Sequence, residues 1–204
     1  MKQMLLKSAL KDYQNPGNFP ITLSICFVTC LLALVSLALP VMDWFRFDSV
    51  AIAQNEEYWR LITGHFVHTS LAHGFWNMAI FIMIAAYLER KNPEQLSMGL
   101  SLAIVGLGAY MLSPIAHIEF YSGLSGISYC LLILAYWEWQ KNHSPLVGLI
   151  PALLIIGKTL FVMQAGETAS AAEGWLFVVE AQIIGVVLGL AGLFYLNRRN
   201  NKAA

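Results

Sequence analysis

The feature that most constrains this chain is a series of long apolar segments that carry almost no charge. Residues 13–42 contain no Asp, Glu, Lys or Arg, and a helix needs about 20 mostly apolar residues to cross a bilayer. Only 12% of the 204 residues are charged, about half the share found in soluble domains. The sequence therefore predicts an all-α membrane protein with six transmembrane helices. Their approximate ranges are 20–40, 61–88, 95–116, 121–137, 145–165 and 175–196.

The basic residues outside these spans predict the orientation of the bundle. With the N-terminus in the cytoplasm, only Arg46 and Arg60 fall in an outer loop, which agrees with the positive-inside rule. We therefore expect one domain over 1–204, with a short cytoplasmic segment 1–19, a cytoplasmic tail 197–204 and both termini cytoplasmic. The expected location is a bacterial inner membrane. The basic residues then on the cytoplasmic side are Lys2, Lys7, Lys11, Arg90, Lys91, Lys141, Arg198, Arg199 and Lys202.

The composition also argues against several classes of function. The formal net charge is zero and no basic tract exists, so nucleic acid is not an expected partner. The three cysteines lie in apolar runs without further ligands, and no metal or cofactor is predicted. A transporter is disfavoured because no internal repeat is present. We interpret His65 as an outer-loop residue near the lipid headgroups, and Lys158 as a cation that reaches the interface or pairs with Glu180.

The predicted topology places polar residues from three helices at one depth. The second, fourth and sixth spans all run from outside to inside. Near their outer ends lie His68, His73 and Asn77 in the second, Ser125 in the fourth and Gln182 in the sixth. Polar groups inside a bilayer are costly and tend to face the bundle interior, where they mark functional sites. We therefore expect these side chains to form one site.

Small residues predict how the helices close around this site. Ala181, Gly185 and Gly189 follow one another at four-residue spacing in the sixth span. Such a stripe of small residues allows two helix backbones to approach closely. Gly123 and Gly126 offer a matching smooth surface at the start of the fourth span. Close packing of these two spans would bring the serine and the glutamine named above together.

Together these motifs resemble the rhomboid family of intramembrane serine proteases, over nearly the whole chain. The short chain and the GLSG sequence look like the rhombosortase branch. Members of that branch are thought to cleave membrane-anchored proteins that end in Gly-Gly, an apolar helix and a basic tail. The motifs are the WR pair Trp59-Arg60, the HxxxxHxxxN pattern of His68, His73 and Asn77, the GxSGxxY pattern of Gly123, Ser125, Gly126 and Tyr129, and the AxxxGxxxG stripe that begins at Ala181.

The resemblance implies a role for each matching residue. Ser125 would attack the scissile carbonyl of a membrane-anchored protein substrate and form an acyl-enzyme. Its backbone N–H, together with His73 and Asn77, would donate hydrogen bonds to the oxyanion. Tyr129 would pack against the general base. The other supporting residues implied by the resemblance are His68, Trp59, Arg60, Gly123 and Gly126.

One position departs from the family pattern. The family has its general-base histidine in the sixth span where this chain has Gln182. A glutamine amide holds a similar volume, but it cannot accept the serine proton as an imidazole does. Three explanations remain open. The chain carries an inactivating substitution in an otherwise intact protease, it is a natural pseudoprotease that binds membrane helices, or another histidine, best placed at His73, serves as the base.

Overall fold

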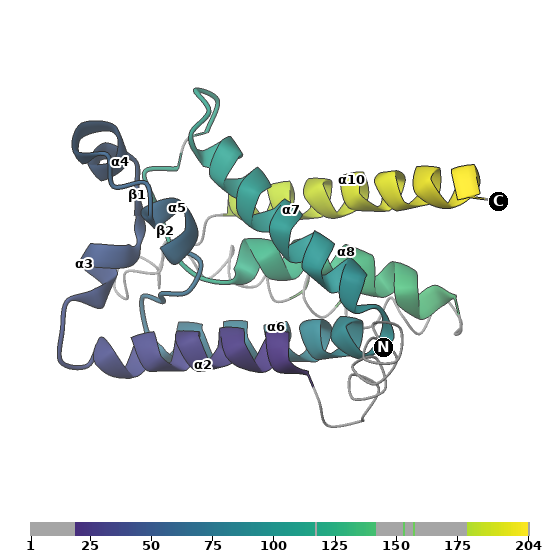
Figure 1. Ribbon diagram of the computed structural model, residues 1–204. Helices are drawn as coiled ribbons and strands as arrows, with labels where there is room; N and C mark the ends of the chain where they lie inside the picture. The colour runs from purple at the N-terminus through teal and green to yellow at the C-terminus, as the bar shows by residue number, and fades with distance from the viewer. Residues whose placement is uncertain (1–18, 117, 142–152, 154–156, 158–178, 204) are drawn as a thin grey trace, which may run out of the picture.

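Long helices form the body of the molecule, and the short elements gather at one end of it (Figure 1). The computed structural model describes residues 19–116, 118–141, 153, 157 and 179–203, and it is mostly helical. The elements are α2 (Pro20–Val35), α3 (Val41–Phe45), β1 (Phe47–Asp48), α4 (Ser49–Asn55), α5 (Arg60–Thr63), α6 (Leu71–Lys91), α7 (Pro93–Met111), β2 (Phe120–Tyr121), α8 (Ser125–Gln140) and α10 (Val179–Ala203).

The second and fourth spans begin later than the sequence predicted, and the first and third end earlier, at Val35 and Met111. The second span was expected to begin at residue 61, but α6 begins at Leu71, because the Ser70 side chain caps it by accepting a hydrogen bond from the His73 N–H. The fourth span was expected from residue 121, but α8 begins at Ser125. Residues 120–121 instead form β2, which pairs with β1 in a two-stranded antiparallel sheet. The fold is therefore mostly helical, which is compatible with the predicted all-α membrane protein, and it adds one small sheet.

The helices carry the apolar surface expected of a membrane protein. Both α6 and residues 179–199 of α10 are long and apolar enough to cross a membrane, and α2 is a shorter apolar helix. Large apolar side chains point outward along these helices, among them Phe27, which is 68% exposed, and Phe194, which is 60% exposed. Such exposure fits a lipid environment rather than water. Lys158 and all of the predicted fifth span except residues 153 and 157 lie outside the described residues.

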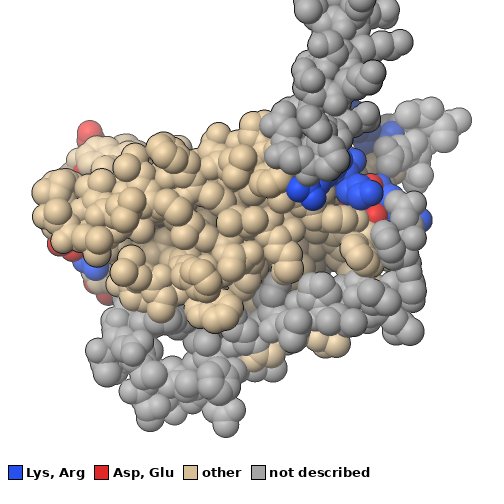
Figure 2. Space-filling view, turned by 90° about the horizontal axis from the view of Figure 1, so that it is seen from below, with Lys and Arg blue, Asp and Glu red and all other residues tan. Residues whose placement is uncertain are grey.

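The directions of the helices follow the predicted alternation. Figure 1 shows that α6, α8 and α10 run the same way, whereas α2 and α7 run the opposite way. The shared end of α6, α8 and α10 is basic, with Arg90 and Lys91 in the last turn of α6, Lys141 after α8 and Arg198 in α10. Figure 2 shows most of the blue Lys and Arg atoms at this end, and a long uncharged body beside it.

Contact between α8 and α10 brings the two predicted catalytic helices together. A Cβ atom on Gly185 would lie only 2.2 Å from the Gly126 carbonyl oxygen, and one on Gly189 would lie 2.8 Å from the Cys130 carbonyl oxygen. A Cβ on Gly126 would in turn lie 3.1 Å from the Ala181 carbonyl oxygen. The two backbones therefore touch along the stripe of small residues, as the sequence spacing predicted.

A buried carboxylate in the last turn of α6 connects this helix to the start of α2. The Glu89 side chain is 1% exposed. It accepts hydrogen bonds from the Ile21 N–H at 2.7 Å, the Thr22 N–H at 2.8 Å and the Thr22 hydroxyl at 2.6 Å. These N–H groups belong to the first turn of α2, where no other backbone acceptor is available within the helix. Glu89 therefore caps α2 from a neighbouring helix and fixes how the two helices pack.

Candidate active site

Ser125 lies at the first position of α8, directly after a tight glycine turn. Gly123 has a φ of +106°, which favours glycine, and its N–H donates to the Gly64 carbonyl oxygen at 2.9 Å. A Cβ at this position would also lie 2.9 Å from Asn77 Nδ2 and 3.2 Å from His73 Nε2. The turn therefore requires glycine for two reasons. Ser125 itself is half-buried.

His73 and Asn77 lie one turn apart on α6 and face this turn from the opposite side. Both are buried, at 8% and 4% exposure. The His73 ring is held through Nδ1, which lies 3.1 Å from the Thr69 hydroxyl. Asn77 Nδ2 is a buried donor for which the described residues offer no hydrogen-bond partner. Unpaired buried donors are rare in folded proteins, and one beside a nucleophile is a candidate oxyanion contact.

His68 supports His73 through ring packing. The two ring centroids lie 5.1 Å apart in an edge-to-face arrangement. Burial lowers the pKa of His68 to about 3, with a further lowering from His73, so the ring is neutral at neutral pH. His68 thus packs as an uncharged ring between the start of α6 and the loop before it.

Gln182 lies in the first turns of α10, on the helix that contacts α8. It is 7% exposed, and its Oε1 atom has no hydrogen-bond partner among the described residues. Tyr129, one turn after Ser125, packs close to Gly185, whose Cβ would lie 3.2 Å from that of the tyrosine. The serine, the glutamine and the tyrosine therefore come from the two helices that touch. A buried amide at this position can form hydrogen bonds but does not titrate.

The Trp-Arg pair anchors the segment between α2 and α6. Arg60 is buried and donates from Nη1 to the carbonyl oxygens of Asp43 at 2.9 Å and Arg46 at 3.0 Å. Its Nε donates to the Glu57 carboxylate at 2.6 Å. The Trp59 indole N–H reaches the Trp44 carbonyl oxygen at 3.3 Å. Arg60 therefore satisfies two carbonyl oxygens at the end of α3 by hydrogen bonding, and it holds β1 close to α5.

Two residues at the site were missed by the sequence analysis. His65 was interpreted as an outer-loop residue near the headgroups, but it is buried, with 1% exposure. Its Nδ1 lies 3.3 Å from the Tyr121 hydroxyl, which donates to the Gly123 carbonyl oxygen at 2.6 Å. The Ser125 hydroxyl and the Gly126 N–H lie within hydrogen-bonding reach of the same phenolic oxygen. Only the β1–β2 pairing, which places Tyr121 close to Ser125, reveals this cluster.

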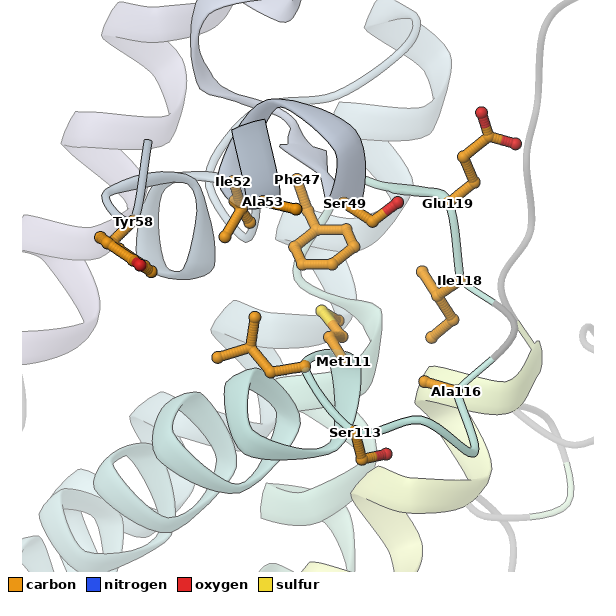
Figure 3. A pocket seen from close by; sticks show the side chains of 11 residues that line it. Phe47, Ser49, Ile52, Ala53, Tyr58, Met111, Ser113, Ala116, Ile118 and Glu119 are labelled. Atoms are coloured by element: carbon orange, nitrogen blue, oxygen red, sulfur yellow. The ribbon is translucent and has the colours of Figure 1, made fainter. Parts of the chain in front are cut away.

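A pocket opens beside the small sheet, on the side of β1 and the end of α7 (Figure 3). Its volume is about 530 Å³. Its walls are both apolar and polar, with Phe47, Ile52 and Met111 at its centre and Glu119 at one side. None of the predicted site residues lines it. In the described ranges no group of three His, Cys, Asp or Glu side chains is placed to hold a metal ion.

Comparison with known families agrees with this arrangement. Residues 55–199, which include every predicted site residue, match the rhomboid domain. No curated protein sequence matches the chain. The matched range begins at the end of α4 and ends in α10, so it spans the turn of Ser125, His73 and Asn77 on α6, and the glycine stripe. The chain therefore belongs to the rhomboid family, whose members are integral membrane proteins and generally intramembrane serine proteases.

Proposed function

We propose that this chain is built to cleave membrane-anchored proteins near the outer membrane face, with Ser125 as the nucleophile, and that Gln182 makes it slow or inert as written. One observation carries the proposal: Ser125 begins α8 beside a buried Asn77 amide that has an unpaired donor. A donor of this kind is available to an oxyanion without first breaking another hydrogen bond. His73, on the same face of α6, supplies a second nitrogen next to the turn.

The chemistry would proceed by acyl transfer. The Ser125 Oγ attacks the scissile carbonyl, and the carbonyl oxygen becomes an oxyanion held by the Ser125 N–H, His73 and Asn77. The C–N bond then breaks, the amine leaves with a proton, and water hydrolyses the acyl-enzyme. Removal of one oxyanion donor typically lowers turnover by about 10²–10³. Tyr129 and the glycine stripe keep α8 and α10 at the distance that the reaction requires.

Gln182 is the residue that limits catalysis in this proposal, because it cannot act as a general base. The attack on the carbonyl needs a group that takes the serine proton and returns it to the leaving amine. The Gln182 amide occupies the position of that group in the family, but it has no titration in this pH range. Loss of the base in serine hydrolases removes several orders of magnitude in rate.

The membrane arrangement belongs to the same proposal. We propose six spans with both termini cytoplasmic, in a bacterial inner membrane, because the basic residues gather at the shared end of α6, α8 and α10. The site then opens at the opposite, outer end. The substrate class that fits the resemblance is a protein with a C-terminal Gly-Gly, an apolar helix and a basic tail.

A second candidate function follows from the same glutamine. A rhomboid-like protein that lacks its base can still bind transmembrane helices, and it would then act by association rather than by cleavage. The intact glycine turn of Ser125 and the unpaired Asn77 donor favour the protease, because a binding protein has no need of either.

Restoring the base separates the two functions. The Gln182→His variant should cleave a membrane-anchored reporter that carries the Gly-Gly, helix and basic tail, and it should react with a serine-directed fluorophosphonate. A Ser125→Ala change in the same variant should abolish both. The unaltered chain should show little of either. A folded Gln182→His protein that binds the reporter but neither cleaves nor labels would replace the protease with the binding function. Full activity of the unaltered chain would show that the base lies elsewhere.

A further inference from the structure

A buried polar pair lies directly beneath the nucleophile and has no part in the mechanism given above. His65 and Tyr121 are 1% and 3% exposed. Their rings meet edge to face, with centroids 5.2 Å apart, and His65 Nδ1 lies 3.3 Å from the tyrosine hydroxyl. The other His65 nitrogen, Nε2, is buried with no hydrogen-bond partner among the described residues. The pair is therefore buried, but the hydrogen-bonding capacity of His65 is only partly used among the described residues.

The Tyr121 hydroxyl lies between the pair and Ser125. As a donor it has two acceptors within reach, the Gly123 carbonyl oxygen at 2.6 Å and His65 Nδ1 at 3.3 Å. Its oxygen also lies at the start of α8, where a Cβ on Gly126 would be 3.3 Å away, and there it can accept from the Ser125 hydroxyl and the Gly126 N–H. When His65 carries its proton on Nε2, a continuous donor–acceptor chain runs from the Ser125 hydroxyl through the phenol to Nδ1.

We propose that Tyr121, backed by His65, accepts the Ser125 proton in this chain and supports slow acyl-enzyme formation in the absence of a base at position 182. The inference rests on the proposed protease function and adds the residues that replace its missing base. Tyr121 is the catalytic residue, since it touches the reacting oxygen. His65 acts through it.

Every proton released in this step has an acceptor. The Ser125 Oγ–H bond breaks as the Oγ–C bond to the scissile carbonyl forms, and that proton passes to the phenolic oxygen. The phenol releases its own proton to His65 Nδ1, which becomes cationic. The leaving amine recovers a proton by the reverse path as the C–N bond breaks. No oxidant, metal or further reactant is needed.

The environment of the pair explains why this route is slow. Burial lowers the pKa of His65 to about 4 and raises the pKa of Tyr121 above its ordinary value. A cationic His65 in this position is therefore unfavourable, and a weaker base gives a slower proton transfer. The β1–β2 pairing, with Phe47 opposite Tyr121, keeps the phenol in place under the serine.

The test compares labelling rates with a fluorophosphonate in two backgrounds of the full chain in proteoliposomes. In the unaltered chain, Tyr121→Phe and His65→Gln should each slow labelling at least about tenfold. In the Gln182→His background, where an imidazole takes the proton, the same changes should cost no more than about threefold. Tyr87→Phe, which removes a phenol hydroxyl near the opposite end of α6, is the matched control and should leave both rates unchanged.

The outcomes separate this inference from the proposed function. Equal losses in both backgrounds would show that the pair only supports the turn of Ser125, and would overturn the inference. Labelling by Gln182→His, with none in the unaltered chain above that of Ser125→Ala, would also overturn it while leaving the protease function intact. Failure of the Gln182→His variant to label would remove both. Selective loss in the unaltered chain alone is the supporting result.

Discussion

Gly126 and Gly185 place two helix backbones in direct contact: a Cβ on Gly185 would lie 2.2 Å from the Gly126 carbonyl oxygen, closer than real Cβ atoms come to backbone. Gly126 follows Ser125, and Gly185 lies one turn after Gln182. The contact between these two glycines therefore sets how near Ser125 lies to Gln182. The glycine stripe shapes the candidate site as well as the packing of the bundle.

Gly185→Ala should therefore lower the stability of the protein more than an identical change further along α10. The new methyl group meets backbone, which cannot move aside, so we expect a loss of about 1–3 kcal/mol in the free energy of unfolding. Gly192→Ala is the control, because its Cβ would meet only the ends of the Leu102, Leu134 and Met98 side chains at 3.2–3.4 Å. Thermal unfolding in detergent measures both. Equal stability of the two variants would contradict the close contact.

Glu89→Ala should loosen α2 from α6. The change leaves the Ile21 and Thr22 N–H groups of α2 without their acceptor in a buried place, and an unsatisfied buried donor costs about 1–3 kcal/mol. Glu138→Ala removes a carboxylate of the same kind, which is 12% exposed and pairs with the exposed Lys141 side chain, and should cost less, at most about 1 kcal/mol. Denaturant or thermal unfolding compares the two. A larger loss at Glu138 would refute the capping role.

Much of this arrangement could be predicted from the sequence because its signals are periodic. The spacing of His73 and Asn77 on one helix face, and of Gly185 and Gly189 along another, requires only helical geometry. Both helices form, and both patterns face α8 or its turn. The family match over residues 55–199 agrees with the same motifs.

The missed features depend on the chain between helices. The late start of α6 comes from the Ser70 cap, and the burial of His65 comes from how the segment between α5 and α6 packs against β2. Two-residue strands leave no periodic signal, so the pairing that brings Tyr121 under Ser125 could not be foreseen. Loop geometry of this kind is set by tertiary contacts rather than by local preference.

Stability should fall as the pH is lowered below about 6.5. Burial lowers the pKa of His65 to about 4 and that of His68 to about 3, whereas both titrate near 6.5 in the unfolded chain. Between these values the unfolded chain binds protons that the folded chain does not, so each histidine costs up to about 1.4 kcal/mol per pH unit. Thermal unfolding at pH 7, 6 and 5 measures this slope. His65→Gln should make it shallower, and an unchanged slope would argue against the burial of His65.

The proposed topology predicts the side of the membrane on which each segment lies. A reporter active only outside the cytoplasm should be silent when fused after Ala204, and active when inserted within residues 166–173. The expectation rests on the basic residues at the end of α6 and α10. The opposite pattern of activity would reverse the orientation, and the site would then open towards the cytoplasm.

The final prediction concerns the unpaired donor that carries the proposed function. In the Gln182→His background, Asn77→Ala should lower turnover of the membrane-anchored reporter by about 10–10³, because Nδ2 stabilises the oxyanion more than the bound substrate. The effect should fall on kcat with little change in KM. Asn92→Ala is the matched control. It removes the side-chain cap of α7 at the other end of the molecule, at a cost of about 1 kcal/mol in stability, and should leave kcat unchanged. A kcat for Asn77→Ala equal to that of the control would exclude Asn77 from the oxyanion site and leave His73 and the Ser125 N–H as its donors.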